Sequence, residues 1–157
     1  MDCAAAYLED ATRASSSEDD VDDEPRFGSS FAALAVFDEV VAPAAARFQP
    51  DIVLVSAGYD AHWRDPLAGL HYRTGTYHRL SKRLKALADD LCGGKIVFLL
   101  EGGYDLVGLS EGVTDSFRAL LGDASGEKSD AIDGLVDADD AKVRKVLREA
   151  TTTHQLA

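Results

Sequence analysis

Two stretches of this 157-residue chain decide its fold: residues 51–62, DIVLVSAGYDAH, and residues 96–105, IVFLLEGGYD. Each begins with a continuous run of β-branched and other apolar residues, the pattern of a parallel strand that is buried on both faces. Each run ends in glycine and polar residues, which mark the turn after a strand. We therefore expect two strands, at 52–55 and 96–100, that are buried on both faces.

Helical patterns flank both strands. Between the strands, apolar residues in 74–92 recur at intervals of three and four, which places them on one face of a helix. Gly93 and Gly94 provide its stop. Three more helices are expected: 31–48, kinked or divided by Pro43; 106–120, stopped by Gly122; and a last one from about Asp139, a plausible N-cap.

The order helix, strand, helix, strand, helix predicts an α/β fold, a parallel sheet with flanking helices, joined by a right-handed crossover. Two strands are too few for a stable parallel sheet with both faces covered. We therefore expect the sheet to be incomplete.

The negative charge of the chain is concentrated in two segments. The chain has 28 acidic and 16 basic residues, a formal net charge of −12. Residues 1–24 contain nine acids and one base, and residues 123–140 contain seven acids and one base. We interpret 1–28 as a disordered acidic tail, because its serine and acidic run buries too little apolar surface to fold. The second segment is expected to be an acidic loop within a folded part at 29–157.

Composition also excludes several classes of protein. The acidic balance argues against a nucleic-acid-binding domain, which needs a basic face. No apolar run is long enough for a transmembrane helix, and no targeting segment is recognised at the start of the chain. Cys3 and Cys92 are too few for a disulfide framework or a four-thiolate zinc site.

Residues that can carry chemistry follow the two strands, where ligands bind in open α/β sheets. Asp60 is either a metal ligand or a cap for its own loop. With His62 it forms a D-x-H pair, whose side chains face the same way in extended backbone and could reach one zinc ion. Gly102 and Gly103 permit unusual backbone angles or close approach, or simply make a tight turn. The hydroxyl of Tyr104 could stabilise an oxyanion.

Three blocks of the sequence together resemble the zinc-dependent histone deacetylase family: residues 51–62, the Asp-Pro-Leu at 65–67, and residues 100–106. The similarity is to the carboxy-terminal half of the family's domain and is strongest to plant, class II-like, organelle-associated members. It implies a partial arginase/deacetylase-like fold, truncated on its amino-terminal side. It also implies hydrolysis of acetyl-lysine with Zn²⁺ as the cofactor.

The resemblance assigns a role to each candidate site residue. Asp60 would be one of three zinc ligands, and Tyr104 would bind the acetyl carbonyl and stabilise the tetrahedral oxyanion. Gly102 and Gly103 would form the wall of the acetyl-lysine tunnel, and Leu67 would line it. In this family His62 would not be a ligand, because the zinc-binding D-x-H lies earlier in the chain. The resemblance thus contradicts the D-x-H interpretation, and we follow the resemblance.

The family's tandem histidine pair and its other D-x-H motif have no counterpart in this chain. We therefore expect a fragment that is inactive alone. The alternative is a non-catalytic α/β interaction module with an acidic tail and a protein partner. For the complete protein, the expected partner is an acetylated protein or a small acetylated amine, with neither nucleic acid nor membrane. The resemblance suggests a plastid or mitochondrion, with cytoplasm or nucleus still open.

Overall fold

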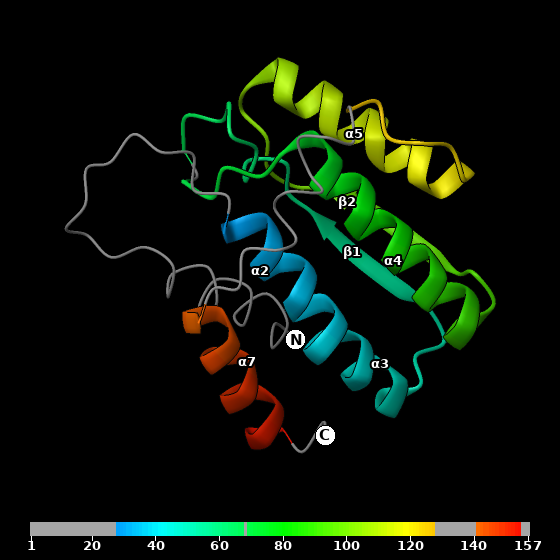
Figure 1. Ribbon diagram of the computed structural model, residues 1–157. Helices are drawn as coiled ribbons and strands as arrows, with labels where there is room; N and C mark the ends of the chain where they lie inside the picture. The colour runs from blue at the N-terminus through cyan, green and yellow to red at the C-terminus, as the bar shows by residue number, and fades with distance from the viewer. Residues whose placement is uncertain (1–27, 68, 128–140, 155–157) are drawn as a thin grey trace.

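The computed structural model describes residues 28–67, 69–127 and 141–154. Apart from Gly28, the predicted acidic tail lies outside these residues, and so does most of the predicted acidic loop, from 128 to 140. Figure 1 shows the elements of the described part, which alternate as the sequence predicts. In chain order they are α2 (Gly28–Val36), the π-helix η1 (Phe37–Val41), α3 (Ala42–Phe48), β1 (Val53–Ala57), α4 (Thr74–Cys92), β2 (Ile96–Leu100), α5 (Leu106–Leu121) and α7 (Ala141–Thr153).

The two strands pair in parallel and are connected through α4, which confirms the predicted parallel sheet. The register runs from Val53 opposite Ile96 to Ala57 opposite Leu100. Pairing continues beyond the strands, because the Tyr59 N–H donates to the Gly102 carbonyl at 2.9 Å. The loops that follow β1 and β2 are therefore held at the same edge of the sheet.

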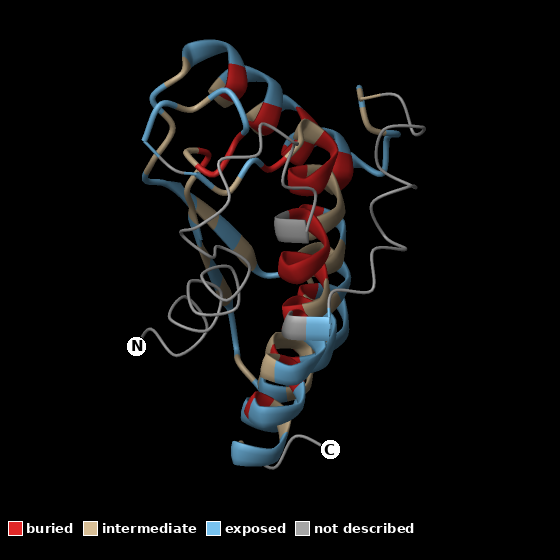
Figure 2. Cartoon of the chain, turned by 60° about the vertical axis from the view of Figure 1, so that its left-hand side comes forward, coloured by how far each residue is buried: buried red, intermediate tan, exposed pale blue. Residues whose placement is uncertain are grey.

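The prediction that both faces of the strands are buried is wrong for the described part of the chain. Along β1 the side chains are alternately partly buried and exposed, and Leu54 is 64% exposed. Leu99 of β2 is 50% exposed, and Figure 2 shows the exposed residues along the strands. The described helices pack against only one face, so residues of the other face have no covering layer. The sheet is incomplete, as its two strands led us to expect.

Residues 28–48 form one helical rod with a π-helical turn in the middle. The Ala42 N–H donates to the Phe37 carbonyl, five residues back, and Pro43 lies in the first turn of α3. Proline has no N–H and is best tolerated at the start of a helix. The predicted division at Pro43 is therefore observed as a change of hydrogen-bond pattern just before it.

The buried core has two parts. One joins α2 and η1 to α7, and is made of Phe31, Ala32, Val36, Val40, Val143, Leu147 and Ala150. The other joins α2 and α4 to the loops after β1, and is made of Ala33, Tyr59, Ala61, Tyr72 and Tyr77. The second cluster supports the loop that carries Asp60. None of the described helices is both long and apolar enough to cross a membrane.

The helix boundaries follow the predicted stop signals where the structure describes them. Gly93 and Gly122 end α4 and α5 in the left-handed conformation, with φ of 66° and 86°. The side chain of Asp105 caps α5 by accepting from the Gly108 N–H at 2.7 Å. The expected N-cap of the last helix, Asp139, lies outside the described residues.

The substitution Leu147→Ala is expected to lower the free energy of unfolding by roughly 2–5 kcal/mol, because it leaves a cavity in the core beneath α7. Leu147 is only 1% exposed. Urea unfolding followed by circular dichroism measures the change. Arg148→Ala, at the exposed neighbouring position, is the control and should stay within about 0.5 kcal/mol of wild type. Equal effects of the two substitutions would contradict the packing of α7 described above.

Candidate functional site

The backbone of Gly102 lies directly against the side chain of Asp60. A Cβ added to Gly102 would clash with the Asp60 carboxylate, and one added to Gly58 would lie 3.0 Å from its Oδ1. Asp60 is partly exposed. Within the described part of the chain its carboxylate accepts no hydrogen bond, so the alternative that it caps its own loop is not supported.

The turn after β2 presents Tyr104 to the outside. Gly103 has φ of +130°, and a Cβ there would lie 3.0 Å from Leu109 and 3.2 Å from Tyr59. Both the backbone angle and the close packing therefore require glycine. Tyr104 itself is 59% exposed, and its hydroxyl makes no hydrogen bond to any residue that the structure describes.

One carboxylate joins the Tyr104 turn to the segment that holds Leu67. Asp65 Oδ2 accepts the N–H of Tyr104 at 2.7 Å, and Asp65 Oδ1 accepts the N–H of Leu67 at 2.9 Å. Leu67 is 70% exposed. Sequence reasoning named Asp65 only as part of the Asp-Pro-Leu block. The signal that could have found it is the tendency of an aspartate to accept the N–H two residues on.

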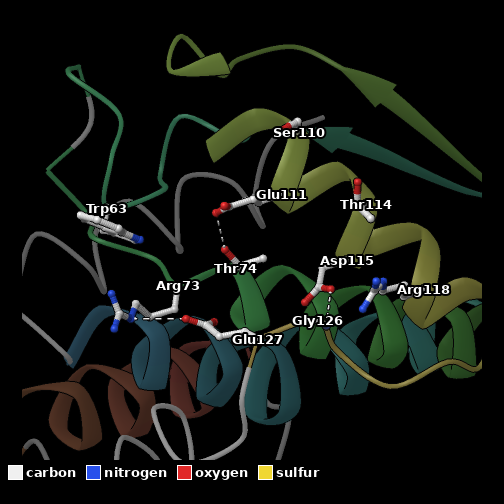
Figure 3. Close-up of a pocket in the computed structure, with 10 residues that line it drawn as sticks. All are labelled: Trp63, Arg73, Thr74, Ser110, Glu111, Thr114, Asp115, Arg118, Gly126 and Glu127. Atoms are coloured by element: carbon white, nitrogen blue, oxygen red, sulfur yellow. Dashed lines mark hydrogen bonds and ion pairs between the residues drawn. The ribbon is translucent and has the colours of Figure 1, made fainter. Parts of the chain in front are cut away.

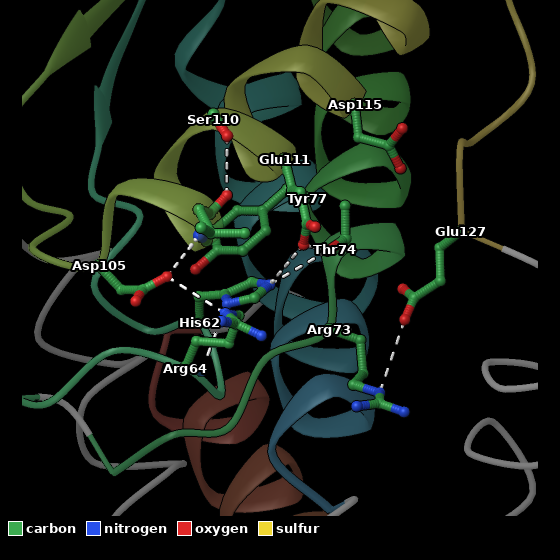
Figure 4. A network of polar contacts seen from close by, with 12 residues as sticks. His62, Arg64, Arg73, Thr74, Tyr77, Asp105, Ser110, Glu111, Asp115 and Glu127 are labelled. Atoms are coloured by element: carbon green, nitrogen blue, oxygen red, sulfur yellow. Dashed lines mark hydrogen bonds and ion pairs between the residues drawn. The ribbon is translucent and has the colours of Figure 1, made fainter.

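The expectation that His62 could join Asp60 as a metal ligand is wrong in this structure. His62 is 0% exposed, and both of its ring nitrogens are engaged (Figure 4). Its Nδ1 accepts the Arg64 N–H at 3.3 Å, and its Nε2 lies 3.1 Å from the Thr74 hydroxyl. That hydroxyl donates to Glu111, so Nε2 must carry the proton and His62 is neutral. Burial also lowers the pKa of His62, which favours the same form.

Two buried tyrosines support the loop that carries Asp60. The rings of Tyr59 and Tyr77 lie 5.0 Å apart, and the Tyr77 hydroxyl donates to the Tyr59 carbonyl at 3.1 Å. The Tyr59 hydroxyl donates to the Ser116 hydroxyl at 3.1 Å. Burial raises the pKa of both phenols, so both stay protonated at physiological pH. Their hydrogen bonds hold the residue before Asp60 against α4 and α5.

The described residues fit zinc only as part of a larger ligand set. Catalytic zinc is usually held by three protein ligands with one open position. No group of three histidine, cysteine, aspartate or glutamate side chains gathers around one point among the described residues. Residues 28–67, 69–127 and 141–154 therefore do not gather a complete set of three such ligands around Asp60.

A separate cleft of about 530 Å³ lies away from Asp60 and Tyr104, between the start of α4, one side of α5 and the segment after α5 (Figure 3). The Arg73 guanidinium lies 5.6 Å from the Trp63 ring and its Nε lies 3.6 Å from Glu127. Asp115 accepts hydrogen bonds from Ser125 and the Gly126 N–H. Arg73 and Glu127 are thus paired here, whereas Asp115 is held by neutral donors. No motif in the sequence had pointed to this cleft.

Solved structures identify the class of fold. The chain is similar to the structure of the histone deacetylase Clr3, with a TM-score of 0.64 and 25% identity over 78% of this chain and 19% of that one. It is also similar to the HDA15 HD domain, with a TM-score of 0.59 and 32% identity over 81% of this chain and 33% of that one. The fold is therefore a partial deacetylase fold.

Sequence comparison identifies the family. The histone deacetylase domain model matches residues 23–120, more than half of the chain. The chain belongs to the histone deacetylase family, which confirms the resemblance. It is 50% identical to "Histone deacetylase 14, chloroplastic" of Arabidopsis thaliana and 49% identical to "Histone deacetylase 10, chloroplastic" of Oryza sativa subsp. japonica, in both cases over 84% of this chain. The chain spans only 31% and 30% of these relatives.

The substitution Gly102→Ala is expected to lower the free energy of unfolding by about 1–3 kcal/mol, because the added methyl group overlaps the Asp60 carboxylate. The penalty should largely disappear when Asp60 is also alanine. A double-mutant cycle by urea unfolding measures both effects. Gly69→Ala is the control, since nothing lies within 4 Å of its added Cβ. An undiminished penalty in the double variant would contradict the close approach.

The charge of Asp105 should stabilise the fold only above acidic pH. Its hydrogen bond from the Gly108 N–H lowers the pKa of the carboxyl below its ordinary 3.8. The stabilisation is therefore complete above that value and is lost as pH falls through the lowered pKa. Asp105→Asn keeps the cap but removes the charge. The gap in melting temperature between wild type and this variant should close at low pH, and Asp90→Asn controls for net charge. A gap that widened with acidification would have the wrong sign.

Proposed function

We propose that this chain forms the carboxy-terminal part of a zinc-dependent deacetylase domain that hydrolyses the N-acetyl group of acetyl-lysine. Asp60 would be one of the zinc ligands and Tyr104 the hydrogen-bond donor to the oxyanion. The observation that carries the proposal is the common position of these two residues. Each lies just after a strand, at the same edge of a parallel sheet, in a chain that belongs to the histone deacetylase family.

The chain's own residues have distinct parts in the proposed reaction. Zinc, when bound, supplies a Lewis acid that polarises the acetyl carbonyl and activates water. The exposed hydroxyl of Tyr104 donates to the oxygen that gains negative charge in the transition state. Gly102 and Gly103 have no side chains, so the lysine chain of the substrate can pass close to the backbone. Leu67, held by Asp65 at the same rim, supplies apolar surface for its methylene groups.

The proposed reaction needs residues that the described part of the chain does not assemble. A water nucleophile requires a positioned base, and the zinc requires two further ligands. His62 cannot fill either role, because it is buried and both of its ring nitrogens are engaged. We therefore expect deacetylation only when this chain is joined to the remainder of a deacetylase domain. The exposed face of the sheet supports this view, since it offers apolar surface for a further layer.

The proposed substrate is an acetylated amine, because the zinc ligand and the oxyanion donor would act on the acetyl group. An acetylated lysine of a protein and a small acetylated amine both carry the acetyl group that this arrangement would hold. The names of the two chloroplastic relatives support a plastid as the place of action. A mitochondrial, cytoplasmic or nuclear location is the alternative, and targeting of the complete protein would decide it.

A non-catalytic interaction module is the second candidate, and one observation favours it. Leu54 and Leu99 lie on the same face of the paired strands and are both at least half exposed. An apolar sheet face of this kind is a typical binding surface for another protein. In this reading, Asp60 and Tyr104 would be remnants of the family's site without a function in this chain.

Two substitutions separate the proposed roles of the site residues in a chimera that joins this chain to the amino-terminal portion of the Arabidopsis relative. Tyr104→Phe should leave zinc bound and lower kcat by about 10²–10³, the usual effect of losing one oxyanion donor. Asp60→Ala should lose zinc and activity together. Turnover of an acetyl-lysine peptide and metal analysis give the two readouts.

Matched controls make the result specific. Tyr59→Phe removes the same hydroxyl group from the loop after β1, where among the described residues it bonds Ser116, and should keep turnover within a few-fold. Asp90→Ala removes an exposed carboxylate from α4 and should keep its zinc. Wild-type turnover by Tyr104→Phe, or full zinc content in Asp60→Ala, would overturn the corresponding role. The chain by itself should show no turnover, and turnover by it would contradict the need for the rest of the domain.

A further inference from the structure

We propose that Asp65 is the positioning residue for Tyr104, and that it sets the place of the tyrosine and of Leu67 together. This inference rests on the proposed function, because it concerns the orientation of the oxyanion donor. Asp65 would touch neither the substrate nor the metal. It would act through the backbone of the turn that carries Tyr104.

The contacts of Asp65 join the two loops at the sheet edge. Its Oδ2 accepts the N–H of Tyr104 at 2.7 Å and that of Asp105 at 3.3 Å. Its Oδ1 accepts the N–H of Leu67 at 2.9 Å. Charge-assisted bonds of this kind are stronger than neutral ones. One carboxylate therefore fixes the backbone of both segments that would line the acetyl-lysine tunnel.

The loop that carries Asp65 is itself rigid enough to serve as a reference. His62 is fully buried at its start, and its carbonyl accepts the Asp65 N–H at 2.8 Å. The Trp63 N–H donates to the Tyr72 carbonyl at 2.9 Å, and the Tyr72 N–H donates to the Ala61 carbonyl at 2.7 Å. These bonds tie residues 61–65 to the segment before α4. The backbone of Asp65 is thus fixed independently of the contacts that its side chain makes.

The other contacts of the Tyr104 turn lie on either side of the tyrosine: the Gly102 carbonyl accepts the Tyr59 N–H, and the Asp105 side chain caps α5. Two glycines precede the tyrosine, and glycine gives the backbone its largest freedom. The phenol makes no hydrogen bond within the described part of the chain, and the side chain is 59% exposed. The carboxylate of Asp105 has different partners from that of Asp65. It caps α5 and accepts from Arg64 Nε at 3.3 Å. Asp105 therefore anchors the helix, whereas Asp65 anchors the residue that carries the hydroxyl.

Amide hydrogen exchange of the full chain tests the positioning without any turnover. In Asp65→Ala, the amides of Tyr104 and Asp105 should exchange at least about tenfold faster, because the carboxylate that protects them is gone. Amides within α4 and β1 should keep their rates. Asp65→Asn retains an acceptor oxygen and should give an intermediate rate at Tyr104. Asp90→Ala removes an exposed carboxylate from α4 and should change neither amide.

An unchanged rate at Tyr104 in Asp65→Ala would overturn the proposal, and so would an equal increase throughout the chain, which would indicate a general loss of stability. The chimera then tests the consequence for chemistry. Asp65→Ala should lower kcat at least about tenfold with zinc content nearly unchanged, and its effect on kcat should be small in a Tyr104→Phe background. If exchange at Tyr104 increases but Tyr104→Phe keeps full turnover, the proposed function fails while the positioning by Asp65 stands.

Discussion

The parallel pairing of β1 with β2 is the constraint on which the candidate site depends. Parallel strands place both of their carboxyl ends at one edge of the sheet, so the segments after Ala57 and Leu100 must lie side by side. Asp60 and Gly102 then come into contact, although they are far apart in the sequence. An antiparallel pair would have separated the same residues by the length of a strand.

The loops at this edge are held by polar side chains that form hydrogen bonds to a neighbouring loop or helix. His62 is neutral and enclosed, and it ties the loop after β1 to Thr74 at the start of α4. Two carboxylates then join the loop after β1 to the turn after β2. Asp65 accepts from the backbone of the Tyr104 turn, and Asp105 accepts from Arg64. These contacts surround the exposed phenol of Tyr104 and the Asp60 carboxylate, neither of which is hydrogen-bonded to a described residue.

The helices show a similar division between a supported side and a bare side. Packing of α7 on α2 and of α4 on α5 gives the described part its cores, and one face of the sheet rests on this layer. The other face presents Leu54 and Leu99 to solvent. Membership of the histone deacetylase family, together with the small share of the relatives that this chain spans, supports the proposal that further protein covers that face.

The sequence by itself determined the strands, the helix at 74–92, the helix ends at Gly93 and Gly122, and the family, because apolar spacing, glycine stops and motif residues are local signals. It also placed Asp60 and Tyr104 after strands. Only the tertiary structure decided that His62 turns into the core, that Asp65 binds the Tyr104 turn, and that one sheet face is bare. Those features depend on contacts between segments that are distant in the sequence. The spacing of apolar residues predicts local helices and strands but does not predict the hydrogen-bond partner of each polar atom.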